Sequence, residues 1–211
     1  MDGTAILARL RERLGDRVLA THEYRGDHTA VMSREGLLAA LTLCRDDAAL
    51  GFDMLVDVTA VDYLRFPGRE DGPRFEVVYH LYSVANGHRV RLKAPVEQDD
   101  PVVPTACGLW PIANWLEREV WDMFGVRFAG HPDLRRILMW ETYDEGHPLR
   151  KDFPLRGRFS RAEQVRRALG ADLAAHYSMD ELSIADAYAA VPADMRARLA
   201  GGAGPANDEG A

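Results

Sequence analysis

The segment that decides the fold is "RFEVVYHLYSVANGHRVRLKAPV", residues Arg74–Val96. Two runs rich in β-branched and aromatic residues flank the dipeptide Asn86-Gly87, and such runs are typical of strands. Asn-Gly is a strong hairpin signal because both residues tolerate a positive φ. The segment therefore predicts antiparallel pairing of Phe75–Ala85 with His88–Val96 around a primed two-residue turn.

The second of these strands has two unlike faces. Val90 and Leu92 point to one side, whereas Arg89, Arg91 and Lys93 point to the other, since side chains alternate along a strand. A basic stripe of this kind usually faces solvent, and we favour that interpretation over docking. The chain carries 26 Lys and Arg against 33 Asp and Glu, a net charge of −7, which argues against nucleic acid as the main partner.

Upstream, "FDMLVDVTAVDYL" at residues 52–64 predicts a further strand. Its alternation gives one uniformly apolar face, formed by Phe52, Met54, Val56, Val58 and Ala60. Together with the hairpin, this strand predicts a sheet.

The N-terminal residues 1–15 carry apolar side chains at helical spacing and predict an amphipathic helix. This segment lacks the basic start and apolar core of a signal peptide, and no apolar run in the chain approaches the length of a membrane span. We therefore expect a soluble protein. Short strands are expected at 18–24 and 28–32, followed by a second helix over 34–50 with Ser33 as its N-cap. With 47% hydrophobic residues, the chain can bury a sizeable core.

Downstream, "GLWPIANWLEREVWDMFG" at 108–125 predicts a helix that Gly125 ends. On a helical wheel Glu119 falls within the apolar face of this helix. Two hypotheses stay open: a basic group pairs with a buried Glu119, or Glu119 lies at the rim of the face in water. The opposite, polar face carries Glu117, Arg118, Trp121 and Asp122.

Residues 126–157, which we call the arm, contain two Gly-His-Pro turns, each followed by a basic pair. Proline favours extended geometry in the residue before it, so we predict a long, mostly extended arm. Its basic residues are candidate partners for the acids of the preceding helix: Arg135, Arg136, Arg150 and Lys151.

The chain offers little that indicates catalysis or a metal centre. His131 and His147 could meet Asp133 or Asp152, but sixteen positions of irregular chain separate the two histidines, and metal ligands need a scaffold that this spacing does not show. The two cysteines, Cys44 and Cys107, stand far apart, which argues against a cluster or a disulfide. Nucleophile-elbow, Walker A and dinucleotide-binding motifs are all missing from the sequence.

The predicted organisation has four parts. Residues 1–125 form an α+β domain of two layers with a mixed, partly antiparallel sheet, and 126–157 form the extended C-terminal arm. Residues 158–200 are predicted to be helical, with Ser160 as N-cap and Glu163 completing a capping box. The small, polar end at 201–211 is predicted to be a disordered tail.

From "NWLEREVWDMFGVRFAGHPDLRRIL" onward the chain resembles the 30 kDa subunit family of proton-pumping NADH–quinone oxidoreductase, respiratory complex I. The second turn, residues 146–154, and the strands at 57–64 and 74–83 also resemble the family, so the likeness covers roughly 52–155. The resemblance implies that a set of motif and interface residues matters for docking: Glu117, Arg118, Glu119, Asp122, His131, Pro132, Arg135, Arg136, His147, Pro148, Arg150, Lys151 and Asp152.

The resemblance also implies a function. It indicates a non-catalytic subunit of the peripheral arm that holds no cofactor or metal of its own and docks on the 49 kDa-type subunit, close to the iron–sulfur subunits B, G and I. The whole complex is implied to use NADH, FMN, iron–sulfur clusters and a quinone. The chain is then expected at the cytoplasmic face of the inner membrane, held there through partners. The alternatives are the equivalent subunit of a related membrane-bound hydrogenase or dehydrogenase and, more distantly, a stand-alone His/Asp hydrolase.

Overall fold

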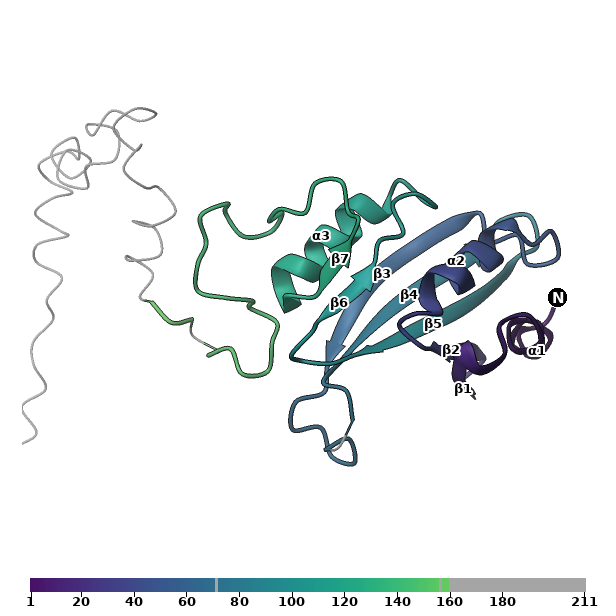
Figure 1. Ribbon diagram of the computed structural model, residues 1–211, viewed down its shortest axis with the longest axis horizontal. Helices are drawn as coiled ribbons and strands as arrows, with labels where there is room; N and C mark the ends of the chain where they lie inside the picture. Colours follow the sequence, from purple (N-terminus) through teal and green to yellow (C-terminus); the bar gives the residue numbers. More distant parts are fainter. Residues whose placement is uncertain (71, 156, 160–211) are drawn as a thin grey trace, which may run out of the picture. The chain divides into compact units, whose positions relative to one another are not determined.

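A five-stranded mixed sheet forms the centre of the molecule (Figure 1). The computed structural model describes residues 1–159 apart from 71 and 156, and these residues belong to one unit, Met1–Phe159. The strand order is β1-β2-β5-β4-β3. The strands span Val18–Tyr24 (β1), Asp27–Met32 (β2), Met54–Asp62 (β3), Phe75–Ser83 (β4) and His88–Val96 (β5).

The predicted hairpin is confirmed in its pairing but not in its turn. Antiparallel pairs run from Phe75 with Val96 to Ser83 with His88, which leaves a four-residue connection. Gly87 has a φ of +64°, whereas Asn86 is not among the non-glycine residues with positive φ. The primed two-residue turn was therefore wrong. The loop is instead closed by the Gly87 N–H, which donates to the Ser83 carbonyl at 2.9 Å.

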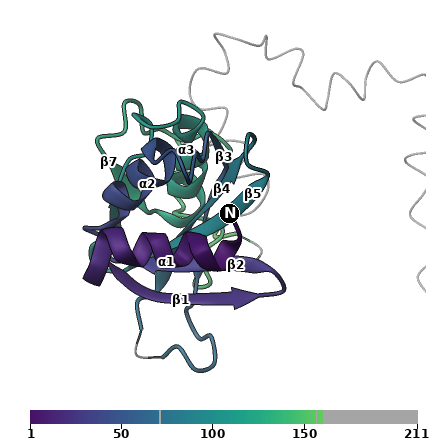
Figure 2. The same cartoon turned by 90° about the vertical axis from the view of Figure 1, so that its right-hand side faces the viewer.

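Three helices share one core with one face of this sheet (Figure 2). They are α1 (Gly3–Leu14), α2 (Leu37–Asp46) and α3 (Ala113–Phe124). The antiparallel β1–β2 pair is joined to β5 by parallel pairing of β2, so the sheet is mixed. The predicted α+β class with a mixed sheet is confirmed.

The second predicted helix starts later than expected. Ser33 does not cap α2. Its hydroxyl accepts a hydrogen bond from the Gly36 N–H at 3.1 Å, which closes a turn ahead of Leu37, and α2 has no side-chain cap. The short strands and the first helix lie where the sequence predicted them, with the Asp2 carboxylate capping α1.

A bulge in β3 overturns the predicted apolar face of that strand. The pairing register with β4 shifts between Leu55 and Asp57, and such an extra residue moves the following side chains to the opposite face. Met54 and Val56 are therefore about half exposed, at 47% and 50%, whereas Leu55 is buried. The alternation beyond the bulge buries Val58, Ala60 and Asp62.

The basic stripe of β5 is neutralised by acids of the neighbouring strands. Arg89 and Arg91 both contact Asp27 of β2, at 2.7 and 3.0 Å, and Lys93 contacts Glu76 of β4 at 2.9 Å. Only Arg89 of the three is largely exposed. The stripe thus helps to hold β2, β5 and β4 together. The interpretation of the stripe as a solvated face was therefore right only for Arg89.

After the sheet, β6 (Val102–Pro104) and β7 (Arg127–Ala129) form a short parallel pair on either side of α3 in the sequence. From Gly130 to Phe159 the described chain contains no further helix or strand. Among the described residues no helix has the length and hydropathy that a membrane span requires. The predicted helical segment 158–200, apart from its first two residues, and the predicted tail 201–211 lie outside the described residues.

Candidate functional site

The wheel prediction for helix α3 was right in part: Val120 and Met123 of the predicted apolar face are buried, but the N-terminal members of that face are not. Ile112 and Trp115, counted as apolar core, are 50% and 59% exposed, and Glu119 is exposed beside them. The inward face instead follows the spacing Ala113, Glu117, Val120 and Phe124, all of which are buried. The prediction failed at this end because the wheel counted the outward apolar residues Ile112 and Trp115 as core and the inward Glu117 as solvated.

The buried acid is therefore Glu117 and not Glu119. Glu117 is fully buried, and its carboxylate accepts hydrogen bonds from the Thr105 hydroxyl at 2.5 Å and the Ala106 N–H at 2.6 Å. The Cys107 thiol lies 3.6 Å away. Burial raises the pKa of Glu117 to about 7, although these donors act in the other direction. Among the described residues no basic side chain lies within salt-bridge distance of it.

Glu119 makes no salt bridge within the described part of the chain. The hypothesis that a basic residue of the arm pairs with a buried Glu119 in this chain is therefore wrong, and the solvated alternative holds. Arginine pairing occurs one turn further along α3, at Asp122.

Asp122 connects α3 to the arm. Its side chain is fully buried, and one carboxylate oxygen accepts the backbone N–H groups of residues 137–139 at 2.8–3.0 Å. The other oxygen contacts the Arg136 guanidinium at 2.5 Å. Burial alone would raise the pKa of Asp122, but the Met139 N–H, Arg136 and the other two amides hold that pKa below its usual range.

Arg118 secures the same part of the arm from the neighbouring position. It is buried and donates to the carbonyl oxygens of Arg135 and Arg136 at 3.1 and 2.8 Å. Its guanidinium also lies over the Trp115 ring, 5.6 Å from the centroid. Because arginine cannot lose its proton in proteins, these carbonyls have a permanently charged donor.

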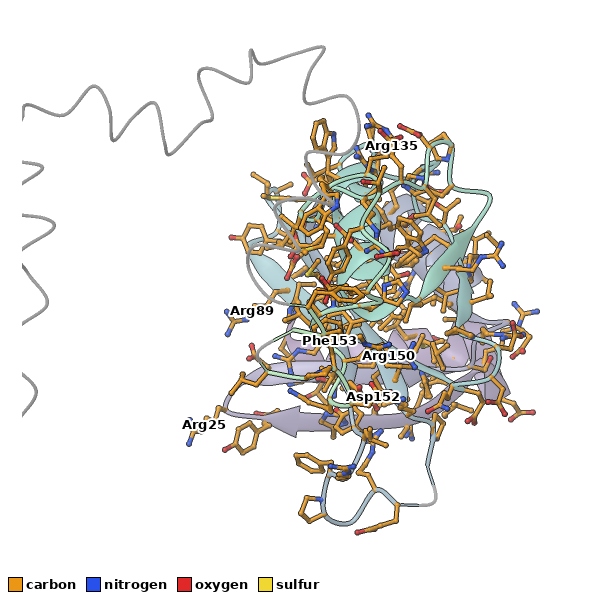
Figure 3. The ribbon with its side chains drawn as sticks, turned by 90° about the vertical axis from the view of Figure 1, so that its left-hand side faces the viewer. Arg25, Arg89, Arg135, Arg150, Asp152 and Phe153 are labelled. Carbon is orange, nitrogen blue, oxygen red and sulfur yellow. The ribbon has the colours of Figure 1, made fainter. Side chains whose placement is uncertain are left out.

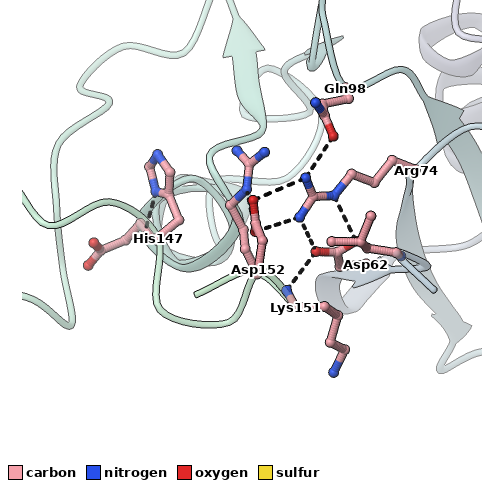
Figure 4. A network of polar contacts seen from close by, with 9 residues as sticks. Asp62, Arg74, Gln98, His147, Lys151 and Asp152 are labelled. Carbon is pink, nitrogen blue, oxygen red and sulfur yellow. Dashed lines mark hydrogen bonds and ion pairs between the residues drawn. The ribbon is translucent and has the colours of Figure 1, made fainter. Parts of the chain in front are cut away.

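A second polar network ties the end of the arm to the sheet (Figure 4). Arg74 makes a bidentate contact to Asp62 at 2.7 and 2.9 Å and reaches Asp152 of the arm at 2.6 Å. The Lys151 N–H donates to Asp62 at 2.8 Å. Burial opposes ionisation of Asp62, but Arg74 and the backbone donors hold its pKa below the usual range.

Sequence reasoning missed both Asp62 and Arg74. The usable signal was the position of Asp62, which shares the inward parity of Val58 and Ala60 in β3. An acid there needs a buried partner, and Arg74 immediately precedes Phe75, the residue of the next strand that pairs with Asp62.

The two Gly-His-Pro turns contact opposite ends of α3. A ring nitrogen of His131 lies 3.0 Å from the Asn114 carbonyl in the first turn of α3. A ring nitrogen of His147 lies 2.9 Å from the Asp122 carbonyl in the last turn. The metal cluster that would combine both histidines is therefore not formed. In the described residues a different group of possible ligands comes together instead: Cys107, Glu117 and His131.

The predicted interface residues divide into two sets. Most are engaged in contacts within the chain, as described above for Glu117, Arg118, Asp122, Arg136 and Asp152. Figure 3 shows Arg135 at one end of the view and Arg150 with Asp152 near its centre. Five of the predicted residues are exposed, namely Glu119, Pro132, Arg135, Lys151 and Asp152, and Asp152 is therefore both exposed and engaged.

Comparison with known proteins gives consistent matches. Residues 30–159 match the family described as respiratory-chain NADH dehydrogenase, 30 Kd subunit. The C-type subunit of NADH-quinone oxidoreductase from Acidithiobacillus ferrooxidans is 49% identical over 159 residues, which covers 73% of this chain and 78% of the relative. The protein of the same name from Roseiflexus sp. is 50% identical over 155 residues, 74% of this chain and 86% of the relative.

Solved structures agree with this. A trypsin-resistant fragment of Nqo5 is 34% identical with a TM-score of 0.56, covering 64% of this chain and all of the fragment. A chain of the membrane-bound sulfane sulfur reductase, an archaeal respiratory membrane complex, is 26% identical with a TM-score of 0.56. That match covers 72% of this chain and 86% of the other.

Proposed function

Because the chain belongs to the 30 kDa subunit family of respiratory-chain NADH dehydrogenase, we propose that it is a structural and assembly subunit in the peripheral arm of a proton-translocating NADH–quinone oxidoreductase. In this proposal the chain docks on the 49 kDa-type subunit near the quinone site. The iron–sulfur subunits B, I and G are its further neighbours. NADH, FMN, the iron–sulfur clusters and the quinone belong to the complex as a whole, and this chain carries no redox centre.

The observation that carries this proposal is the outward face of α3. Ile112 and Trp115 are 50% and 59% exposed on a helix whose other side is fully engaged by the sheet and the arm. Exposed tryptophan is typical of interface anchors, because it buries a large area at a small entropic cost. Glu119 lies one turn further along α3, and the carbonyl of Arg135 accepts a hydrogen bond from Arg118, which lies over the Trp115 ring. Both exposed charges suit the polar rim of an interface.

The internal networks support docking as well. Asp122, Arg118 and Arg74 fix the arm to the body of the protein through buried, charge-assisted hydrogen bonds. A surface whose backbone is fixed in this way loses less conformational entropy on binding than a free segment would. In the proposal, the membrane is reached at its cytoplasmic face, and only through the partner subunits.

A second candidate is the equivalent subunit of a related complex that takes electrons from another donor. The likeness to a chain of an archaeal respiratory membrane complex favours keeping it, since the donor is bound elsewhere in either assembly. The stand-alone His/Asp hydrolase is disfavoured, because His131 and His147 lie at opposite ends of α3.

The test is isolation of the tagged chain from native membranes, with Trp115→Glu as the variant and Tyr24→Glu as its matched control. Tyr24 is 64% exposed on the edge strand β1, away from α3. We expect Trp115→Glu to fold normally by circular dichroism but to lose the 49 kDa-type partner and NADH–quinone turnover. Tyr24→Glu should retain both.

Two results would contradict the proposal. One is normal assembly and turnover of Trp115→Glu. The other is isolation of the wild-type chain without any iron–sulfur subunit. Recovery of a complex that oxidises a donor other than NADH would instead support the second candidate.

A further inference from the structure

We propose that Cys107, Glu117 and His131 form a binding site for a zinc-class divalent metal ion, a site that goes beyond docking. The thiol sulfur, a carboxylate oxygen and an imidazole nitrogen of these residues all lie within 4.8 Å of one another. Zinc takes this combination of ligands at ~2.0–2.3 Å, so atoms that share one ion stand roughly 3–4 Å apart. Small side-chain shifts therefore close the site.

The fold explains why these residues meet although the sequence separates them. Strands β6 and β7 pair in parallel, and the Thr105 N–H extends that pairing by donating to the Ala129 carbonyl at 3.0 Å. The chain leaves the pair as the loop that carries Cys107 and as the turn that carries His131. Glu117 reaches the same place from the inward face of α3. Because the three ligands come from separate segments, no sequence motif marks them, and the proposal revises the sequence-based prediction of no metal.

The charge of the cluster favours a cation. The carboxylates of Asp62 and Asp122, which are also buried, each have a guanidinium partner, whereas the described donors to Glu117 are neutral: a hydroxyl, a backbone amide and a thiol. A buried carboxylate is costly without a counter-charge. A divalent ion between Glu117 and Cys107 supplies one.

Tyr79 provides a second observation. Its side chain is fully buried, and its hydroxyl has no hydrogen-bond partner in the described structure. Burial first, and then the charges of Glu117 and Cys107, raise the pKa of this hydroxyl. Buried hydroxyl groups are normally satisfied. Three protein ligands leave the fourth zinc position to a water, and such a water is a suitable partner for Tyr79.

An ion can reach the cluster from the surface. Cys107 and His131 are half-buried, and Cys107 lies in an open groove of about 590 Å³ that Thr105, Gly130 and Pro132 also line. His131 contacts the Asn114 carbonyl through Nε2 and accepts the Asp133 N–H through Nδ1. Metal binding must displace one of these two hydrogen bonds. The bond from the Asp133 N–H is exposed, so water can replace Nδ1 as the acceptor of that N–H.

The ion would join three segments: the loop at 105–107, α3 and the first Gly-His-Pro turn. Because zinc has no redox chemistry, the site is compatible with a subunit that carries no redox centre. Its role is then to stabilise the base of the surface that the proposed function uses.

The experiment titrates the metal-free, untagged full chain with Zn²⁺ by calorimetry and with Co²⁺ by absorption spectroscopy. We expect one equivalent of metal per chain and the intense charge-transfer absorption that a thiolate ligand gives to Co²⁺. Cys107→Ser should abolish this absorption. His131→Gln should weaken zinc binding roughly tenfold or more, because loss of even the hydrogen-bond partner of a ligand costs about 10–100-fold.

Controls separate the site from accidental binding. Cys44→Ala removes the other, buried cysteine, and His22→Gln removes an exposed histidine of β1; both should bind metal like the wild type. Glu117→Gln preserves the size of the side chain while removing its charge, and it should also weaken binding. Circular dichroism of each variant shows whether it is folded.

The proposal is overturned if Co²⁺ gives no thiolate absorption, if that absorption survives Cys107→Ser, or if folded His131→Gln and Glu117→Gln bind zinc like the wild type. None of these results depends on partner subunits. Trp115→Glu should still bind the metal, so failure of the docking proposal and failure of the metal site are distinguishable.

Discussion

The two Gly-His-Pro turns are nearly identical in sequence and differ in what they hold. The first, at 130–132, places His131 against the first turn of α3, and the second, at 146–148, places His147 against its last turn. Each rigid turn thus sets one end of the arm against one end of the same helix. This answers why the motif occurs twice within one short stretch.

Their basic pairs are used differently. After the first turn, Arg135 stays exposed beside Asp133 while Arg136 enters the buried network of Asp122. After the second, Arg150 lies over the Phe75 ring, 5.1 Å from its centroid, and Lys151 contributes its backbone N–H to Asp62. Local sequence fixes the turn, and the surrounding elements determine which side chain is buried.

The largest effect is expected when Arg136, the buried arginine after the first turn, loses its acid. Asp122→Ala removes the acceptor of three backbone amides and leaves the Arg136 guanidinium, 11% exposed, without its acid. We expect a loss of about 3–5 kcal/mol in the free energy of unfolding, typical of a broken buried ion pair. Urea denaturation of the isolated chain measures it.

Asp133→Ala is the matched control, because it removes the acid of the exposed Asp133–Arg135 pair in the same segment. Its expected cost is about 0–1 kcal/mol. Similar losses for the two variants would show that burial does not distinguish the two arginines, contrary to the comparison.

The next largest effect concerns the contact between the second turn and the C-terminal end of α3. Gly125 ends α3 with a φ of +78°, and a Cβ at this position would stand 2.6 Å from the His147 ring. Gly125→Ala combines left-handed backbone strain with displacement of His147, and we expect it to cost roughly 2–4 kcal/mol. Gly130 also has a positive φ, but the nearest neighbour of a Cβ there is a Thr105 methyl group at 3.4 Å.

Gly130→Ala should therefore cost only the backbone strain, roughly 1–2 kcal/mol. Thermal unfolding of both variants tests the difference. If Gly130→Ala proves the more damaging, then the first turn and not the second is the tightly packed one.

The hairpin and the first helix could be predicted because their information is local. The run Phe75–Val96 alternates and contains a turn signal, so its pairing follows from neighbouring residues alone. The same local reasoning failed at β3, where an inserted residue near Val56 reverses the alternation. Nothing in residues 52–64 marks the bulge, because the Leu55 side chain is as apolar as those of its neighbours Met54 and Val56.

The prediction for helix α3 failed for a different reason. Its acids are buried because distant groups meet them: Arg136 lies 14 positions beyond Asp122, and Thr105 lies 12 positions before Glu117. A helical wheel treats charge as a mark of solvent and cannot include such partners. The residues of α3 and the arm were thus recognised from the family motif, whereas Asp62 and Arg74 were missed, and tertiary contacts set which of the motif residues face inward.

A smaller effect is expected at the end of the arm. Asp152 contacts Arg74 at 2.6 Å but is 49% exposed, and Arg74 keeps Asp62 as its buried partner. Asp152→Asn should therefore cost no more than about 1 kcal/mol. A loss by urea denaturation comparable to that of Asp122→Ala would mean that the second turn depends on its acid as strongly as the first.

The smallest effect is a pH dependence that belongs to the second turn. Burial lowers the pKa of His147, and the nearby Arg136 and Arg150 act in the same direction, against the Asp122 carbonyl and carboxylate. The native state therefore binds the proton less readily than the unfolded chain, in which histidine titrates near ~6.5. The resulting stability is present above that pH and is lost as the pH falls through the lower native pKa.

Replacing the imidazole isolates this contribution. His147→Gln should flatten the fall in unfolding free energy over mildly acidic pH, relative to the wild type in a chelator-containing buffer. His80, whose pKa burial also lowers, contributes equally to both proteins, so the difference between the two curves belongs to His147. His22→Gln, in an edge strand away from the arm, should follow the wild type. Parallel curves for the wild type and His147→Gln would show that the second turn holds His147 without excluding its proton, which would remove this distinction between the two turns.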